Sequence, residues 1–256
     1  SLSKSNIPAE FGGRLASVFD VSAKVGDKEK YKVRGGISPV TGRILFEGPI
    51  QKEKSSVLIG LRSTYSNYIL SLIDNPDFKN SKIFFGDAVT KFSFDINEKN
   101  TLNLFGYFSS DDINVGGSSL FKNQNIGGSA IYTHSFNPKQ HVDLSLVYSQ
   151  NTLEVENSEN IREAYRQNAL LEHQEAKLDF MLLPADNHRI TYGANAILYH
   201  LDRGEYLPAG PESVIEAKIL GKEQALEGGI YVSDEWQISS DLTLIAGLRY
   251  NVYSFL

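Results

Sequence analysis

The sequence predicts an all-β fold, an antiparallel transmembrane β-barrel. Three observations predict it. Apolar and polar residues alternate at period two in many segments, short polar turns alternate with long polar stretches, and the basic residues of these segments share one face. The composition agrees, because 14 Phe and 13 Tyr with only 8 Pro favour strands.

The alternation identifies individual strands. In residues 141–150, Val142, Leu144 and Leu146 share one face, whereas Asp143 and Ser145 share the other. Comparable patterns predict eleven strands, at Tyr31–Ser38, Gly42–Ile50, Ser56–Tyr68, Asp87–Ile96, Asn100–Ser110, Ile126–Phe136, His141–Gln150, Glu175–Leu183, Arg189–Leu201, Leu226–Ile238 and Leu242–Val252. We interpret Asn157–Leu171 as a loop followed by the start of a strand.

The connections between these strands alternate in length. Short polar turns are expected at Gln51–Ser55, Asn97–Asn100, Asn137–Gln140, Pro184–Asn187 and Ser239–Asp241, and a short first hairpin at Ser38–Thr41 is the exception to the alternation. Long polar loops are expected at Leu72–Lys82, Ser110–Asn125, Asn151–Arg162 and Asp202–Lys218. Outer-membrane barrels have short periplasmic turns and long extracellular loops, whereas a soluble sandwich has no reason to collect its long loops at one end.

The two faces of the strands differ in charge. The apolar face is expected to contact lipid, through residues such as Val57, Ile59, Leu61, Leu144, Leu146, Leu244 and Leu248. The opposite face is expected to line the lumen, with Arg62, Asp87, Lys91, Asp95, Asp143 and Arg249 as candidate contacts for a ligand or for a plug. This distribution is typical of a barrel, because Lys or Arg facing lipid at mid-bilayer costs ~2–4 kcal/mol.

Aromatic residues gather near the ends of the outward faces. Tyr65, Phe136, Tyr192 and Trp236 resemble the aromatic girdle of a membrane interface. Asp234 is an exception, because by parity it faces outward beside Trp236. Either it lies at headgroup depth, or the expected register slips at this position.

Composition limits the classes of function. The 25 basic and 31 acidic residues form no basic stripe, so nucleic acid is not an expected partner. The chain has no cysteine and no apolar run near the ~20 residues of a spanning helix. The N-terminus shows no signal peptide, which leaves a cytosolic protein or an internal piece of an exported one.

No catalytic, metal or cofactor site is expected. The five histidines fall on five separate elements without the spacing of a helical zinc site, and no phosphate-cradling glycine loop occurs. Asp111 with Asp112, or Glu154 with Glu156, could bind Ca²⁺ in a loop, but solvated loop acids are the ordinary interpretation. We therefore expect a protein that is not an enzyme.

Three regions resemble TonB-dependent outer-membrane receptors. Residues 6–24, NIPAEFGGRLASVFDVSAK, are similar to the closing strand of the plug in that family, with a Gly-rich turn at Ala9–Arg14, a strand at Leu15–Ala23 and a charged linker at Lys24–Lys30. Val33–Ile37 and Leu45–Ile50 resemble the first barrel strands, and Tyr231–Tyr250 resembles a common hairpin of these barrels.

The resemblance implies a division of the chain and a function. Residues 1–28 would be the end of a plug with its linker, and residues 29–256 the N-terminal half of a barrel of about 22 strands. The function implied is import of a scarce nutrient across the Gram-negative outer membrane, with lipid and the TonB complex as partners, the latter through a missing N-terminal part. The imported ligand is not identified by the sequence. Loop residues Asp111, Asp112, Phe121 and Tyr206 are candidate ligand contacts.

Three alternatives remain at this stage. The barrel could be a non-transporting scaffold, adhesin or secretion component, or a passive porin, although a porin has no use for a plug-like segment. The chain could also be a soluble antiparallel sandwich. As a half-barrel it should not close by itself, because its edge strands would leave unpaired backbone groups.

Overall fold

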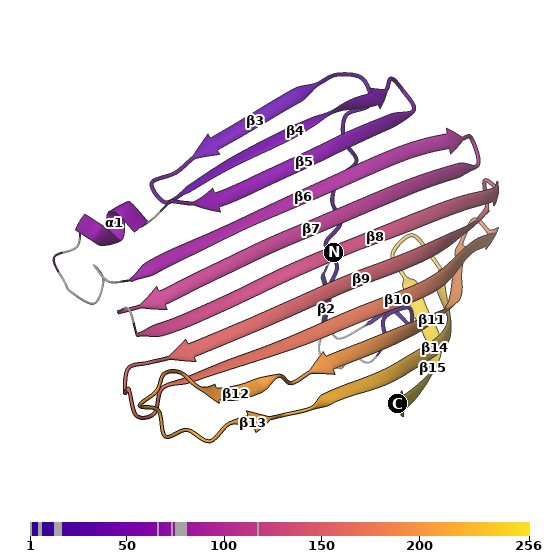
Figure 1. Ribbon diagram of the computed structural model, residues 1–256. Coiled ribbons are helices and arrows are strands. Elements are labelled where there is room, and N and C mark those ends of the chain that lie inside the picture. The colour runs from indigo at the N-terminus through magenta and orange to yellow at the C-terminus, as the bar shows by residue number, and fades with distance from the viewer. Residues whose placement is uncertain are drawn as a thin grey trace.

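The computed structural model describes residues 2–4, 7–12, 17–65, 67–72, 74, 81–116 and 118–256. They form one large, curved antiparallel sheet, with a short N-terminal segment lying against one of its faces (Figure 1). Within the described part of the chain, the only helix is α1 (Asn67–Leu72), and no helix there has the length and apolarity to cross a membrane. The predicted all-β fold is confirmed.

Eleven strands follow one another across the sheet in sequence order. They are β3 (Lys32–Ile37), β4 (Thr41–Gln51), β5 (Ser55–Thr64), β6 (Lys82–Asn97), β7 (Asn100–Val115), β8 (Ser119–Asn137), β9 (Gln140–Asn157), β10 (Tyr165–Ala185), β11 (His188–Asp202), β14 (Lys222–Gln237) and β15 (Thr243–Phe255). All eleven predicted strands are confirmed. Strands β3 and β15 lie at opposite edges and do not pair, so the sheet is open.

The turns that follow β4, β6, β8, β10 and β14 lie at one end of the sheet, on the right in Figure 1, whereas the short turn between β3 and β4 lies at the other end. Two of them use the same local chemistry. The side-chain oxygen of Asn97 accepts a hydrogen bond from the backbone of Lys99 (3.0 Å), and Asn137 does the same for Lys139 (2.9 Å). Asn stabilises tight turns in this way. These turns therefore set the register of β6 with β7 and of β8 with β9.

The predicted long loops are partly wrong. Strands β7 and β8 extend through 110–125 to a tight turn near Gly116, and β9 continues to Asn157. The excursion after β11 contains two further short strands, β12 (Glu205–Pro208) and β13 (Lys218–Ile219). The cause is that these residues are mostly polar, so their pattern does not distinguish a loop from a strand. The predicted strand at Ser56–Tyr68 ends at Thr64, and residues 75–80 lie outside the described residues.

Register partners demonstrate the apolar outer face. One row of cross-strand partners passes through ten strands, and its members are all apolar: Gly48, Val57, Phe92, Leu104, Ala130, Leu146, Ala176, Ala196, Gly228 and Val252. Much of this face is uncovered, for example at Leu146, which is 52 % exposed. Soluble proteins rarely expose so broad an apolar surface, which favours contact with lipid.

Asp234 lies on this outer face, as parity indicates, and no register slip occurs. Its carboxylate lies 2.9 Å from Nδ1 of His188, whose ring stacks on Trp236 with centroids 5.3 Å apart. His188 and Trp236 are register partners next to the short-turn end of the sheet. The register slip is therefore excluded, and the expectation that remains is a position at headgroup depth, where an outward charge costs little.

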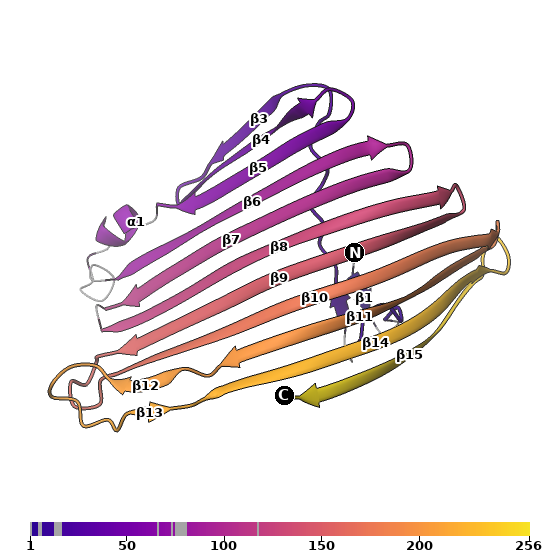
Figure 2. The same cartoon turned by 45° about the vertical axis from the view of Figure 1, so that its right-hand side comes forward.

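The N-terminal segment lies on the opposite face, which we call the inner face (Figure 2). It contains β1 (Leu2–Lys4) and β2 (Ser17–Phe19), which pair antiparallel with each other. The strand expected at Leu15–Ala23 is limited to Ser17–Phe19 in the described residues, and positions 13–16 lie outside them. Residues 20–31 are without strands and cross the sheet toward β3.

Candidate functional site: the inner face of the sheet

The inner face carries the charged residues of the sheet. Strand pairing places six residues expected to line a lumen on this face: Arg62, Asp87, Lys91, Asp95, Asp143 and Arg249. They form separate groups. Lys91, Asp95, Asp143 and Arg249 lie near the N-terminal segment, whereas Arg62 and Asp87 form an ion pair of 2.7 Å with each other.

Three contacts hold residues 23–28 against β4 and β6. The ammonium group of Lys91 donates a hydrogen bond to the backbone oxygen of Ala23 (2.6 Å). Lys24 forms an ion pair with the buried carboxylate of Glu47 (2.7 Å), and Lys28 forms one with Asp95 (2.5 Å). Two lysines of the segment therefore neutralise two carboxylates of the wall, and the wall residue Lys91 binds a backbone oxygen of the segment.

A single side chain holds the other end of the segment. Arg249 on β15 donates from Nη1 to the backbone oxygens of Ala9 (3.2 Å) and Glu10 (3.3 Å). Its remaining nitrogens donate to Asn195 (2.6 Å) and Asn251 (2.6 Å). The planar guanidinium suits this arrangement because it presents several donors in rigid directions.

An aromatic group surrounds this contact. The Arg249 guanidinium lies 5.4 Å from the ring centroid of Tyr231, and the Lys177 ammonium lies 5.5 Å from the same ring and 5.7 Å from Phe11. The Tyr231 hydroxyl donates to Asp179. The ammonium group of Lys177 therefore lies over the face of the Phe11 ring, which attracts a cation.

Sequence reasoning did not select several of these residues. Glu47, Asn195 and Tyr231 have no spacing that distinguishes them from other residues of a strand. For Glu47 a signal exists, since a lone carboxylate in the apolar stretch 44–50 requires a partner when buried. Lys177 follows from parity alone, because the sequence places it on the polar face.

Two cavities remain between the segment and the wall. One has a volume of about 480 Å³ and includes Phe11, Glu175, Glu227 and Arg249 in its lining. The other, of about 230 Å³, lies between Glu10 and the strand residues Asp143 and Asp179. The segment therefore contacts the sheet at discrete points, with polar space between them.

The inner face continues beyond the segment toward the long-loop end. The strand residues there that face inward by register are Ile83, Phe85, Asp87, Ser109, Asp111, Ile113, Phe121, Asn123, Asn125, Asn151, Leu153, Val155, Tyr165, Gln167 and Tyr206. We call this set the upper inner wall. None of these residues is Lys or Arg, but two arginines lie at the same level of the sheet. Arg62 is the register partner of Asp87, and Arg203 pairs with Glu223 (3.2 Å), which faces inward by register on β14.

The four predicted loop residues do not lie in loops. Asp111 and Asp112 belong to β7, Phe121 to β8 and Tyr206 to β12. Asp111, Phe121 and Tyr206 face inward on the upper inner wall, whereas Asp112 faces outward beside Lys82 (3.8 Å). Adjacent Asp111 and Asp112 point to opposite faces, so they do not form a joint calcium site. Within the described ranges, no three His, Asp or Glu residues are arranged to bind a metal ion.

Amide side chains form a hydrogen-bonded row across this wall. Nδ2 of Asn151 donates to Oδ1 of Asn123 (2.7 Å) and to Oδ1 of Asn125 (2.8 Å). Nδ2 of Asn125 in turn donates to the hydroxyl of Ser109 (3.1 Å). The rings of Tyr165 and Tyr206 lie farther along the wall, where Tyr165 pairs with Asn157, and their centroids are 4.8 Å apart.

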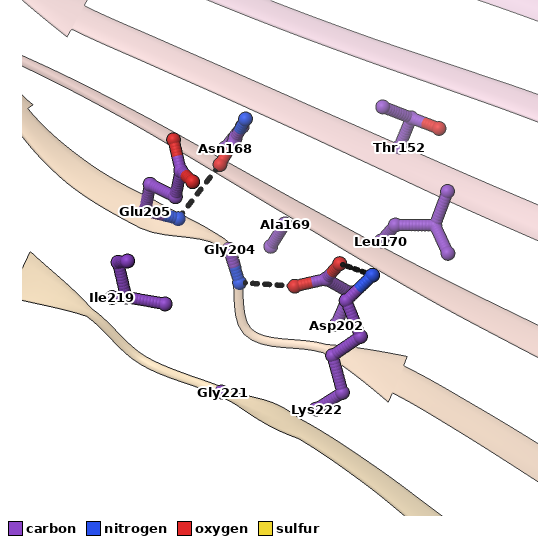
Figure 3. A pocket seen from close by; sticks show the side chains of 10 residues that line it. All are labelled: Thr152, Asn168, Ala169, Leu170, Asp202, Gly204, Glu205, Ile219, Gly221 and Lys222. Carbon is purple, nitrogen blue, oxygen red and sulfur yellow. Dashed lines mark hydrogen bonds and ion pairs between the residues drawn. The ribbon is translucent and has the colours of Figure 1, made fainter.

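A further cavity, of about 410 Å³, lies where the sheet is interrupted between β11 and β12 (Figure 3). Four of its lining residues, Thr152, Leu170, Asp202 and Lys222, are register partners on the outer face. Gly204 has φ +74°, and a Cβ there would overlap the backbone oxygen of Asn168. Hydrogen bonds from the Gly204 backbone and from Lys222 lower the pKa of Asp202 below its ordinary value.

A wall with an apolar outer face, a charged inner face and short turns at one end has the construction of an outer-membrane β-barrel. A model of the TonB dependent receptor-like β-barrel family matches residues 58–256. The chain therefore belongs to this family, whose members are outer-membrane proteins of Gram-negative bacteria, and the outer membrane is its location. The soluble sandwich is thereby excluded.

Solved structures of two receptors share this fold. The ferripyoverdine receptor of the outer membrane of Pseudomonas aeruginosa matches with a TM-score of 0.69 and 12 % identity, over 95 % of this chain and 40 % of its own. The ferric-catecholate import receptor Fiu of E. coli K12 matches with a TM-score of 0.66 and 9 % identity, over 90 % of this chain and 45 % of its own.

A third receptor, the ferric preacinetobactin receptor BauA of Acinetobacter baumannii, matches with a TM-score of 0.63 and 9 % identity, over 88 % of this chain and 41 % of its own. The chain thus spans less than half the length of these receptors. A comparison with curated proteins found no match. At such low identity, the likeness establishes the fold alone.

Proposed function

We propose that this chain belongs to a TonB-dependent receptor that imports a scarce nutrient through a plugged barrel. Residues 1–28 are the end of the plug with its linker, and residues 29–256 are the N-terminal half of the barrel. TonB acts through a part of the receptor N-terminal to this chain. The ligand enters from the long-loop side and passes the inner face.

One observation carries this proposal: the N-terminal segment is attached to the inner face at both ends. Arg249 binds the backbone at Ala9 and Glu10, and Lys91 binds the backbone at Ala23. A wide barrel leaks unless its lumen is filled, so a segment held against the wall supports a plug. Hydrogen bonds and ion pairs of this kind can break and re-form, which suits a plug that must move during transport.

Uptake by the full-length receptor tests the proposal. Gram-negative cells that produce it would be supplied with candidate nutrients as the limiting source, with and without a protonophore and with the energy-coupling protein inactivated. We expect growth that requires both the receptor and energy coupling. Growth without energy coupling would indicate a passive porin, and no receptor-dependent uptake at all would favour an adhesin or scaffold.

Passive leakage provides a second measure that needs no knowledge of the ligand. Arg249→Met with Lys91→Met should loosen the segment and sensitise cells to a bulky antibiotic that the intact outer membrane excludes. The matched control is Arg166→Met with Lys122→Met. Arg166 lies on β10 and Lys122 on β8, and both face outward by register. Equal sensitivity of the two double variants would contradict a plugging role for the segment.

A further inference from the structure

We propose that the upper inner wall binds a neutral, hydroxyl-rich ligand with an apolar face, which is the chemistry of a carbohydrate. The site consists of Ser109, Asp111, Phe121, Asn123, Asn125 and Asn151, which we call the amide–aromatic surface. The inference rests on the proposed function, since it specifies which class of ligand the receptor takes. It concerns binding, so it can be tested separately from transport.

The strands bring these six side chains together on three neighbouring elements. Ser109, Asn125 and Asn151 are register partners on β7, β8 and β9. Asp111 and Asn123 are partners in the adjacent inward row, and Phe121 follows Asn123 on the same face of β8. Neighbouring strands lie about 4.8 Å apart, so the surface is the size of a small ring.

Hydrogen-bond capacity on this surface is mixed. Asn151 uses its amide hydrogens on Asn123 and Asn125, which leaves its Oδ1 as an acceptor. Asn123 retains its donors, Asn125 retains one donor, and the carboxylate of Asp111 forms no ion pair with the described residues. A hydroxyl group both donates and accepts, so a ligand with several hydroxyls matches donors and acceptors placed side by side.

An apolar contact lies next to these polar groups. Phe121 is 42 % exposed on the inner face, and Val155 is its register partner. Aromatic rings combine a large apolar area with little loss of side-chain freedom on binding. A sugar ring presents C–H groups on one face and hydroxyls at its edge, which fits Phe121 beside Asn123.

Charge argues against an anionic ligand here. The amide–aromatic surface has no cation, and Asp111 gives it a negative charge. Arg203, at the far side of the wall, is paired with Glu223 at 3.2 Å. Arg62 lies in the row of Ser109 but is neutralised by Asp87 at 2.7 Å. Arg43 lies three strands from Ser109, about 14 Å away by strand spacing. A ferric chelate with a negative charge would meet no compensating group on this surface.

Binding to the purified full-length receptor in detergent tests the inference. The receptor would be applied to an array of neutral and acidic glycans, and the ligands it retains would be titrated by calorimetry, with ferric citrate and a ferric tris-catecholate as anionic probes. We expect a neutral glycan to bind and the ferric probes to bind at least tenfold more weakly. A free oligosaccharide and a cell-surface polysaccharide are distinguished by comparing short fragments with the intact polymer.

Two variants have matched controls on the opposite face. Asn123→Ala and Asp111→Asn should each weaken glycan binding roughly tenfold, the effect of losing one good hydrogen bond. Gln124→Ala and Asp112→Asn change neighbouring residues that face outward, and they should leave the affinity unchanged. Unaltered migration of the folded barrel on gels shows that each variant has folded.

Three results would overturn the inference. They are failure of every neutral glycan to bind, preferential binding of a ferric probe, and equal losses in the Asn123→Ala and Gln124→Ala variants. Transport is judged separately, because binding in detergent requires no energy coupling. Import of a ferric chelate would refute the proposed ligand class but support the proposed function. Glycan binding without uptake would support the ligand class but contradict the proposed function.

Discussion

Arg249 donates a hydrogen bond to the backbone oxygen of Glu10 at 3.3 Å, although the two residues are 239 positions apart in the chain. The same nitrogen reaches Ala9 at 3.2 Å. Because the acceptors are backbone oxygens, the contact constrains the position of the segment and not its side chains. The path of the N-terminal segment therefore depends on the last strand of the sheet.

Arg249→Met should release this end of the segment. Two charge-assisted hydrogen bonds are lost, and we expect about 2 kcal/mol less stability of the docked state. Limited proteolysis of the folded receptor between positions 8 and 12 should then be roughly 30-fold faster. Arg166→Met, on the outer side of β10, is the matched control. Identical cleavage rates in the two variants would show that Arg249 does not hold the segment.

Spin labels should separate the two faces of β9. The 256 residues include no cysteine, so Leu146→Cys and Asp143→Cys each introduce one labelling position into this chain. Leu146 lies in the outward apolar row, whereas Asp143 lies beside the cavity next to Glu10. The label at position 146 should be accessible to oxygen and the label at 143 to a water-soluble nickel complex. The reverse pattern would refute the register.

Gly204→Val should destabilise the extracellular end of β11. The residue has φ +74°, and a side chain would overlap the backbone oxygen of Asn168. We expect a loss of about 2 kcal/mol or more in the free energy of unfolding, measured by urea titration of the receptor in detergent. Gly127→Val is the control, since a Cβ there makes contacts of 3.8–3.9 Å only. A control as damaging as Gly204→Val would exclude the backbone explanation.

The linker should resist acid because of Asp27. Its ion pair with Lys32 and the hydrogen bonds from the backbone of Glu29 and Lys30 lower the pKa of Asp27. A lowered pKa contributes stability that is present above the ordinary aspartate value, near 4, and is lost as pH falls through the folded value. Amide hydrogens of Glu29 and Lys30 should therefore remain protected at pH 4.

Asp27→Asn supplies the comparison for this prediction. The variant keeps an acceptor oxygen but loses the charge, so protection of the same amides should be weaker than in the wild type wherever Asp27 is ionised, and it should no longer fall in acid. Wild-type protein that loses this protection above pH 4 would contradict the prediction. Asp241, in an exposed turn at the other end of the chain, provides the Asp→Asn control.

Much of the fold could be predicted because each strand carries its own alternating pattern. Leu144 and Asp143 illustrate this, since their opposite faces follow from parity alone. Loop boundaries were less predictable. Residues 110–125 contain only four scattered apolar side chains, so their pattern does not separate a loop from a strand.

The candidate site was only partly predictable for the same reason. Parity places Asp111 and Phe121 on one face, and Asp112 on the other, once the strand is known to continue. The partners of Lys91 and Arg249 could not be predicted, because both are backbone oxygens of a segment that lacks regular structure. Every residue has a backbone oxygen, so the sequence does not show which of these oxygens accepts a hydrogen bond.

The sequence by itself determined the strand order and the outward face, because period-two alternation and short turns are local properties. Only the tertiary structure decided which residues from distant strands become neighbours. Asn123, Asn125 and Asn151 become one hydrogen-bonded row through the pairing of β8 with β9. Similarly, Arg249 meets Glu10 only when the sheet and the N-terminal segment are assembled, because no local pattern encodes a contact over 239 residues.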